Sequence, residues 1–417
     1  MALNISAAYP GQVSTTDPSG YPWGRPRNDI VVGAGNGFPL EEQWVSDVIG
    51  FEQALLSAAS LTPSGTPDKV GASQYLDALR IVDRIERQKA QAQNWTERAS
   101  FHNAGDSATP DGKLGLAWAP DLGVANPGGR YVLIGPSSTA GCNSWSTEDG
   151  TNWEFAGLLS AAEASNPCVA YGKIGGASGY LATYAAPVGY YTSTTGTAWG
   201  TNSATVPAAG AACYAPSLAL WVIAGTSGAI STSPTGLPGS WTARSAPAGW
   251  VSNCGGAKRA IWTGANFIVL PLASYNKCLT SPDGVNWTER TMPTTGVWSG
   301  VAYSSTDSLV MATNLSNSAP SISADGGLTW TSAAGAGWFL GNDVAVQGSL
   351  WVVPTLIGNA GGILYSVDKG ASWNRVTVGN HRVAVQGWNR IIVGENRFMI
   401  AHATGAANEV ALSARAL

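Results

Sequence analysis

The sequence has few charged residues and very few histidines. Asp, Glu, Lys and Arg make up 12% of the 417 residues, about half the usual share. A net charge of −4 does not favour binding to the phosphates of nucleic acid. The three histidines, His102, His381 and His402, lack metal-ligand spacing. We therefore expect no nucleic-acid partner, no metal and no cofactor.

Long apolar runs and paired cysteines are also missing. No stretch approaches the roughly 20 apolar residues that span a bilayer, and the first residues lack a signal-peptide pattern. The five cysteines are an odd number without a CxxC pair. Three of them fall just before or within predicted strands, where a small apolar side chain fits. We expect no membrane insertion, and buried free thiols rather than disulfides, as in a protein made in a reducing cytosol.

Glycine and tryptophan are abundant, with 52 and 18 residues, and tryptophan marks an internal repeat. Six times the chain shows a Ser, a short turn that usually contains Asp-Gly, and then a Trp. Successive Trp residues are 46, 42, 46, 43 and 43 positions apart, the length of one β-propeller blade. The repeat residues predicted to be structural are Trp153, Trp199, Trp241, Trp287, Trp330 and Trp373, with Asp149, Asp283, Asp325 and Asp368 in the turns.

Each repeat carries the same strand signals. An apolar stretch such as 116–118 comes first, and a β-branched and aromatic run such as 131–135 follows a short turn. The Asp-Gly turn then joins the third strand to a fourth strand that opens with Trp. Residues 91–417 are therefore predicted to form a propeller of four-stranded blades.

A seventh Trp suggests how the ring closes. Residues 94–98 and 286–290 have the same sequence, Asn-Trp-Thr-Glu-Arg. Trp95 is therefore predicted to open a fourth strand, although no first three strands come before it. The C-terminal runs 391–393, 398–402 and 409–413 read as three strands without a fourth. We expect 94–98 to complete this last blade, giving seven blades and no exposed edge.

The turn pattern resembles the Asp-box, the bacterial neuraminidase repeat of sialidases and many unrelated propellers. The resemblance covers 91–417 and implies a structural role, with the Asp binding backbone N–H groups and the Trp packing between sheets. Two turns have Thr195 and Thr235 in place of Asp, which also favours a structural role over a catalytic one.

The region before the propeller divides into two parts. Residues 1–38 are rich in Gly, Pro and Asp and are predicted to be an irregular attachment segment. Residues 39–90 are predicted to form two helices. The first has Trp44, Val48, Phe51 and Leu55 on one stripe, and the second, from Lys69, has Ala72, Tyr75, Leu79 and Val82. The stripes predict either oligomerisation, with a homotrimer as the expectation, or a helical hairpin docked on the propeller.

Residues 37–80 are similar to a segment near the N-terminus of bacteriophage tail-fibre and other virion proteins. The shared order is Pro-Leu, an acidic pair, Trp, an apolar helix, Thr-Pro-x-Gly-x-Pro-Asp, and a second helix. The resemblance implies a component of the virion tail, assembled in the bacterial cytoplasm. Residues 1–90 would then bind other virion proteins, and the C-terminal part would face outward.

An enzymatic role finds little support in the sequence. The sialidase resemblance would require three arginines around a substrate carboxylate, yet Arg98, Arg244, Arg290 and Arg375 follow repeat Trp residues and belong on outer strands. No P-loop, HExxH or Gly-x-Ser-x-Gly motif occurs. A pair of carboxylates acting on glycans needs no sequence motif and stays open, but we expect no enzyme and no catalytic residues.

Three tryptophans are the candidate ligand-binding residues. Trp250, Trp298 and Trp338 each precede a predicted inner strand and would form an arc on one face, where aromatic rings suit sugar rings. The alternative is that they pack at blade junctions. The predicted function is a tail or fibre protein whose propeller recognises the host surface, as a glycan receptor. A purely structural virion adaptor or decoration protein is the alternative.

Overall fold

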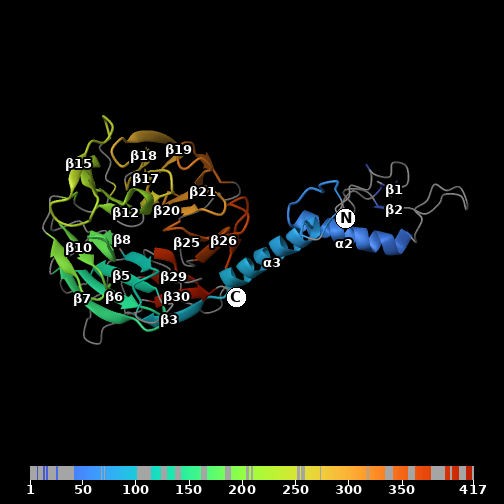
Figure 1. Ribbon diagram of the computed structural model, residues 1–417, viewed down its shortest axis with the longest axis horizontal. Coiled ribbons are helices and arrows are strands. Elements are labelled where there is room, and N and C mark those ends of the chain that lie inside the picture. Colours follow the sequence, from blue (N-terminus) through green and yellow to red (C-terminus); the bar gives the residue numbers. More distant parts are fainter. Residues whose placement is uncertain are drawn as a thin grey trace, which may run out of the picture. The chain divides into compact units, whose positions relative to one another are not determined.

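The fold is seen in a computed structural model (Figure 1). Near the N-terminus it describes residues 7, 13–14, 16 and 25–26. Beyond them the described residues are 42–66, 68–69, 71–100, 114–123, 129–136, 142–160, 167–183, 189–202, 206–207, 210–250, 254, 259–272, 274–316, 319–333, 341–355, 362–376, 390–394, 397–402 and 410–415.

The chain divides into two compact units. The first is Met1–Lys89 and the second is Ala90–Leu417. The division lies one residue from the predicted boundary between 90 and 91. Most of the predicted attachment segment 1–38 lies outside the described residues, apart from short pieces such as the paired strands β1 (Val13–Ser14) and β2 (Arg25–Pro26).

The second unit is mainly β and has the β-propeller fold predicted from the sequence. Seven four-stranded sheets, each with antiparallel neighbours, follow one another around a common centre (Figure 1). The first three are β4 (Gly115–Ala119), β5 (Arg130–Pro136), β6 (Cys142–Thr147), β7 (Glu154–Ser160); β8 (Cys168–Ile174), β9 (Ala177–Thr183), β10 (Tyr190–Ser193), β11 (Gly200–Asn202); and β12 (Ala211–Ala215), β13 (Leu220–Ala224), β14 (Ile230–Ser233), β15 (Thr242–Arg244).

The next three sheets have the same strand order. They are β16 (Ala260–Trp262), β17 (Phe267–Val269), β18 (Tyr275–Ser281), β19 (Thr288–Gly296); β20 (Trp298–Ser304), β21 (Leu309–Asn314), β22 (Ser321–Ser323), β23 (Thr331–Ser332); and β24 (Ala345–Gln347), β25 (Leu350–Thr355), β26 (Gly362–Ser366), β27 (Asn374–Arg375). The first strand of each sheet lies beside the first strands of its neighbours.

The remaining sheet takes strands from both ends of the propeller unit. Its order is β28 (Arg390–Gly394), β29 (Arg397–His402), β30 (Val410–Arg415) and β3 (Thr96–Ser100). β3 pairs with β30 antiparallel, with Thr96 opposite Ser413. β28 in turn lies beside β4. The segment 94–98 and the three C-terminal runs therefore contribute strands to one sheet.

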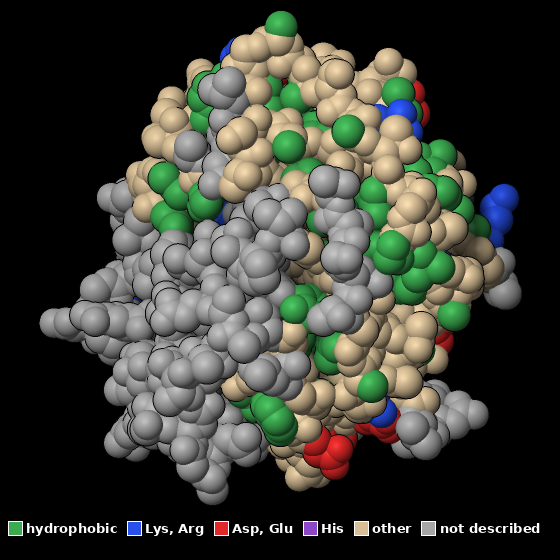
Figure 2. Space-filling model, turned by 90° about the vertical axis from the view of Figure 1, so that its left-hand side faces the viewer, with side chains coloured by type: hydrophobic (Ala, Val, Ile, Leu, Met, Phe, Trp, Pro, Cys, Tyr) green, Lys and Arg blue, Asp and Glu red, His purple; other side chains and the backbone are tan. Residues whose placement is uncertain are grey.

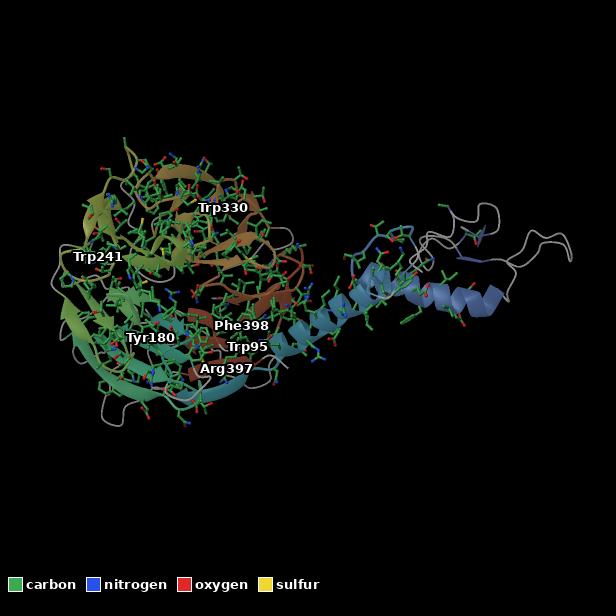
Figure 3. The ribbon with its side chains drawn as sticks, in the orientation of Figure 1. Trp95, Tyr180, Trp241, Trp330, Arg397 and Phe398 are labelled. Atoms are coloured by element: carbon green, nitrogen blue, oxygen red, sulfur yellow. The ribbon has the colours of Figure 1, made fainter. Side chains whose placement is uncertain are left out.

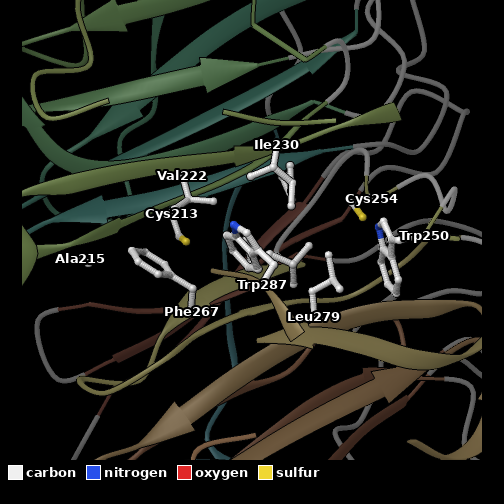
Figure 4. Close-up of a cluster of buried hydrophobic side chains, with 13 residues drawn as sticks. Cys213, Ala215, Val222, Ile230, Trp250, Cys254, Phe267, Leu279 and Trp287 are labelled. Carbon is white, nitrogen blue, oxygen red and sulfur yellow. The ribbon is translucent and has the colours of Figure 1, made fainter. Parts of the chain in front are cut away.

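The repeat tryptophans belong to the apolar core. Seven apolar clusters of the propeller unit each contain one of them, together with residues of two successive sheets. Trp95, for example, packs with Phe398, and its Nε1 donates to the Ala92 carbonyl at 2.7 Å (Figure 3). Figure 4 shows Trp287 between Phe267 and Leu279. Truncation of such a buried ring costs about 3–5 kcal/mol.

The Asp residues of the repeat hold the turns. The Asp283 carboxylate accepts from the backbone N–H groups of Val285 and Asn286, both at 2.8 Å, and from the Ser281 hydroxyl at 3.0 Å. Asp149, Asp325 and Asp368 accept equivalent bonds in their own turns. Partial burial would raise the pKa of Asp283, but these hydrogen bonds outweigh it and hold the pKa at about 2.

Threonine replaces Asp in two turns without loss of the pattern. Thr195 Oγ1 accepts from the N–H groups of Thr197 and Ala198 at 3.2 Å, and Thr235 Oγ1 accepts from Leu237 N–H at 3.2 Å. A neutral hydroxyl therefore occupies the same position as the carboxylate. The role is geometric, as expected for turn residues.

The first unit contains the two predicted helices, with different packing faces. Helix α2 (Glu42–Ala58) and helix α3 (Gln74–Gln93) pack through Leu56, Ala59 and Ala78. Of the predicted stripe residues, Leu55, Tyr75 and Val82 pack against this cluster, whereas Phe51 is 67% exposed and Leu79 is 51% exposed.

The start of α3 also differs from the prediction. The helix begins at Gln74 rather than at Lys69, because Gly71 has a φ of +84° in a preceding turn. Asp68 accepts from Gln74 N–H at 3.0 Å, so its carboxylate caps the first turn of α3. None of the described helices is long and apolar enough to cross a membrane.

The cysteines are free and buried, as predicted. Burial raises the pKa of Cys142, Cys254 and Cys278 to about 12 and that of Cys168 to about 11, and it also raises the pKa of Cys213. These thiols therefore stay protonated and serve as small apolar groups.

Candidate functional site

The first strands of the sheets line a cavity at the centre of the propeller unit. Its volume is about 590 Å³, within the range of small-molecule sites. Residues of β4, β8, β12, β16 and β28 form its wall, with Asp343 from the segment before β24. A second hollow of about 240 Å³ lies against β16, β20, β24 and β28, and Trp262 lines both. We call the space that these strands surround the central channel.

Buried charged groups lie at one end of the channel, where the first strands begin. Arg390, the first residue of β28, donates through Nε to the Leu114 carbonyl and through Nη1 to the Asn342 carbonyl, both at 3.0 Å. Asp343 accepts from Ile391 N–H at 3.1 Å. These bonds connect the start of β28 to the segments before β4 and before β24. We call this end the entry end.

A second arginine stabilises the same end. Arg259, directly before β16, is 2% exposed and donates through Nε to the Trp298 carbonyl at 2.6 Å. Burial, and next the positive charge of Arg390, lowers the pKa of Arg259 to about 9, so the guanidinium stays protonated at neutral pH. Both arginines donate to backbone carbonyls, which indicates a structural role.

The other end of the channel, where the first strands finish, carries aromatic side chains at one repeated position. This position pairs with a fully buried apolar or aromatic residue in the second strand of the sheet, as Trp118 pairs with Tyr131 and Tyr214 with Trp221. Five successive sheets have an aromatic residue there, and all five are partly buried. They are Trp118, Tyr171, Tyr214, Trp262 and Tyr303. We call this set the aromatic arc.

Glycines on neighbouring strands make room for two members of the arc. A Cβ on Gly172 would come within 2.6 Å of Tyr214 Cγ, and a Cβ on Gly394 within 2.4 Å of Trp118 Cγ. Tyr214 therefore lies directly against the backbone of β8, and Trp118 lies against that of β28. Any larger residue at these glycines would displace the rings.

A polar cluster adjoins the arc at Tyr171. The Tyr171 hydroxyl donates to Asp121 Oδ1 at 2.6 Å, and Lys173 Nζ donates to Ser178 Oγ at 2.6 Å. Lys173 Nζ also lies 3.7 Å from Asp121 Oδ2. Partial burial, and next the hydrogen bond to Asp121, raises the pKa of Tyr171, so its hydroxyl remains protonated at neutral pH. We call Asp121, Tyr171, Lys173 and Ser178 the polar rim.

The structure buries two of the three tryptophans predicted to bind ligand. Trp250 is 4% exposed and packs edge-on against Tyr275, at 5.6 Å between ring centroids. Trp298 is 0% exposed and donates through Nε1 to the Tyr275 carbonyl at 2.8 Å. Both therefore lie in the junction between sheets, the alternative that the sequence left open (Figure 4 shows Trp250 beside Cys254). Trp338 lies outside the described residues.

The sequence does not single out the aromatic arc. Four of its members, Trp118, Tyr171, Trp262 and Tyr303, each end an apolar triplet, which indicates a strand but not a site. Alignment of the repeats on the residue that ends each apolar triplet would have found four of them. The fifth member, Tyr214, lies in β12 (Ala211–Ala215) and is recognised from the structure.

The arginine prediction was incomplete. Arg244, Arg290 and Arg375 lie on the fourth strands β15, β19 and β27, and Arg98 lies in β3, as expected. The sequence does not distinguish Arg390, which lines the cavity, or Arg259, which is buried directly before β16. Among the described residues, no group of three or more His, Cys, Asp or Glu side chains could hold a metal ion.

Comparison with known proteins supports the fold alone. No protein-family model and no curated protein matches the chain. The structure is similar to virginiamycin B lyase from Staphylococcus aureus, in a catalytically inactive form with quinupristin, at 10% identity and a TM-score of 0.53 over 77% of this chain and 99% of the lyase. It is also similar to YCF48 bound to D1 peptide, at 14% identity and a TM-score of 0.54 over 77% and 94%.

A third similar structure is the extracellular domain of BT4673 from B. thetaiotaomicron. Its identity is 10% and its TM-score is 0.51, over 76% of this chain and 39% of that one. These neighbours include lyases and a peptide-bound protein. A shared propeller therefore does not decide between catalysis and binding.

Proposed function

We propose that this protein is a bacteriophage tail or tail-fibre component whose propeller recognises a glycan on the host cell surface. One observation carries the proposal: a separate compact unit with two helices precedes a propeller that contains an aromatic-lined cavity. The resemblance of residues 37–80 to virion proteins supplies the biological setting. Aromatic rings beside hydrogen-bonding groups are the features that sugar rings require.

The propeller would be a closed ring of seven blades. The seven four-stranded sheets and the contact of β28 with β4 support this arrangement. In this ring β3 supplies the last strand of the last blade, and no sheet edge stays open to other chains. The turns of the repeat would then be Asp-boxes with a purely structural role.

The first unit would attach the protein to other virion proteins and form a homotrimer. Val48, Phe51, Leu76 and Leu79 on its helices are 40–67% exposed, which leaves apolar surface for partners. The protein would be assembled in the bacterial cytoplasm and reside in the virion tail. Size measurement by light scattering tests this, because a trimer has three times the mass of the 42.8 kDa chain.

Binding is favoured over catalysis by the chemistry of the cavity. The charged groups that line it are Asp343 and Arg390, which bond to the backbone, and Lys173, which bonds to Ser178. On the face drawn in Figure 2 the described side chains are mainly uncharged. A sialidase or another glycan-cleaving enzyme would release sugar from a bound polysaccharide, and we expect no release.

The direct test is binding of the fluorescently labelled full-length protein to bacterial cells. Strains with and without defined surface polysaccharides would be compared. Saturable binding that disappears in one polysaccharide mutant is the expected result. Failure to bind any strain, with the protein folded, would favour the structural alternative. That alternative, a virion adaptor or decoration protein, draws support from the peptide bound to the similar YCF48.

A further inference from the structure

The aromatic arc is a feature that the fold does not require. The same register position is Val346 in the sheet of β24 and Val393 in the sheet of β28, where they pair with Trp351 and Phe398. Both valines pack against the apolar clusters between sheets, as the aromatic residues do. A valine thus satisfies the packing at this position. The extra ring area in the other five sheets calls for another explanation.

The five aromatic residues are consecutive around the channel. Trp118, Tyr171, Tyr214 and Trp262 line the large cavity, and Trp262 and Tyr303 line the small one. All five keep part of their surface exposed, whereas their partners in the second strands, such as Tyr131 and Trp221, are 0% exposed. The arc is therefore a continuous aromatic wall around one side of the channel.

The polar rim adds hydrogen-bonding groups at one point of this wall. The Lys173 and Asp121 side chains are 43% and 47% exposed, so both reach solvent while they face each other. The rim combines one ammonium group, one carboxylate and two hydroxyls. Its formal charge is zero, and it offers both donors and acceptors, as vicinal sugar hydroxyls do.

We propose that the end of the channel where the first strands finish and the aromatic arc lies, which we call the exit end, binds a neutral saccharide. Its apolar C–H faces would contact Tyr214 and Trp262, and its hydroxyls would bond to Lys173 and Asp121. The cavity of about 590 Å³ accommodates one or two pyranose rings. An anionic sugar gains nothing from a rim without net charge. This inference rests on the proposed function and names the ligand class and the residues.

The test compares full-length variants on an array of bacterial surface glycans, followed by tryptophan-fluorescence titration with the bound saccharides. Tyr214→Ala and Trp262→Ala should each weaken the affinity for a neutral saccharide at least tenfold. Phe155→Ala is the matched control, because Phe155 is 48% exposed on the outer strand β7. It should leave the affinity unchanged. Circular dichroism establishes that each variant is folded.

The conservative variant Lys173→Gln guards against effects of altered packing. It keeps a donor but removes the charge, and it should weaken binding several-fold with the fold intact. Preference of the wild-type protein for anionic glycans would overturn the inference.

Equal affinity of the wild type and of folded Tyr214→Ala and Trp262→Ala would overturn the assignment of this site and leave host recognition standing. If the wild-type protein bound neither cells nor any glycan, the proposed function itself would be overturned.

Discussion

The two ends of the channel are formed by the same strands and carry opposite kinds of side chain. At the entry end, Arg259, Arg390 and Asp343 are almost completely buried and bond to backbone groups. At the exit end, the members of the aromatic arc are partly exposed, and the polar rim reaches solvent. The contrast indicates a structural role for the entry end, whereas the exit end is where we propose that the saccharide binds.

The largest effect is expected at the entry end. Arg390→Met would leave the Leu114 and Asn342 carbonyls without their charged donor and disturb the buried Asp343 nearby. The free energy of unfolding should fall by about 3–5 kcal/mol, measured by chemical denaturation. Arg244→Met is the control, because Arg244 donates to Thr232 on an outer strand, and it should cost less than about 1 kcal/mol. Equal losses in both variants would contradict a special role for the entry end.

The next effect concerns the glycine beneath the arc. Gly172→Ala would place a Cβ 2.5 Å from Trp221 Cζ2 and 2.6 Å from Tyr214 Cγ. Overpacking of this kind costs about 1–3 kcal/mol and should also displace Tyr214. The control Gly200→Ala meets its nearest atom, the Thr192 carbonyl oxygen, at 3.9 Å and should be neutral. Thermal unfolding of both variants measures the difference, and an unaffected Gly172→Ala would refute the close contact.

A smaller effect is expected in the repeat turns, away from both ends. Asp283→Ala should cost about 1–2 kcal/mol because two backbone N–H groups lose their acceptor. Asp283→Thr should cost less, since Thr195 and Thr235 already serve in this way. Chemical denaturation of the wild type and the two variants under identical conditions gives the order of their free energies of unfolding. Equal costs for alanine and threonine would show that the acceptor is irrelevant.

The Asp283 turn also predicts that the stability of the protein depends on pH. The pKa of Asp283 is about 2 in the folded protein, against 3.8 as its ordinary value. A carboxylate whose pKa is lower in the folded than in the unfolded protein stabilises the fold fully when the pH is above its pKa in the unfolded protein. This stabilisation is lost as the pH falls through its pKa in the folded protein. The wild type should therefore lose stability between about pH 4 and pH 2, and Asp283→Thr should lose less. Parallel pH profiles of thermal unfolding would contradict this.

The smallest effect on stability is expected in the polar rim. Tyr171→Phe keeps the ring and removes only the hydroxyl that donates to Asp121. The free energy of unfolding should change by less than about 1 kcal/mol, while saccharide affinity falls severalfold. Titration and denaturation of the same sample separate the two quantities. A loss of stability without a loss of affinity would make Tyr171 a packing residue.

The sequence predicted the propeller because its signals are local and repeated. Each Ser-x-Asp-Gly turn fixes a hairpin, and each Trp fixes the start of a fourth strand, so six observations agree. The pairing of 94–98 with the C-terminal strands was predicted because 94–98 is a fourth strand without the first three, and the C-terminal runs are three strands without a fourth. These inferences required no knowledge of which side chains face the channel.

The site was harder to predict because exposure depends on neighbouring sheets. Trp250 precedes an inner strand and Trp298 is the first residue of one, yet the junctions between sheets bury both. Phe51 and Leu79 follow a helical period, yet the helices pack through Leu56 and Ala78 instead. Periodicity identifies an apolar face, but only the packing partners decide whether that face is covered.

The sheet formed by β3 with β28, β29 and β30 has a consequence for synthesis. β3 is among the first strands of the propeller to leave the ribosome, and its partners are the last. At roughly 5–20 residues per second, β3 waits on the order of tens of seconds before its sheet can form. During that time it is a free edge that a neighbouring nascent chain can capture. Exchange of β3 between chains would give interlocked subunits whose propellers are each completed by a strand from another copy.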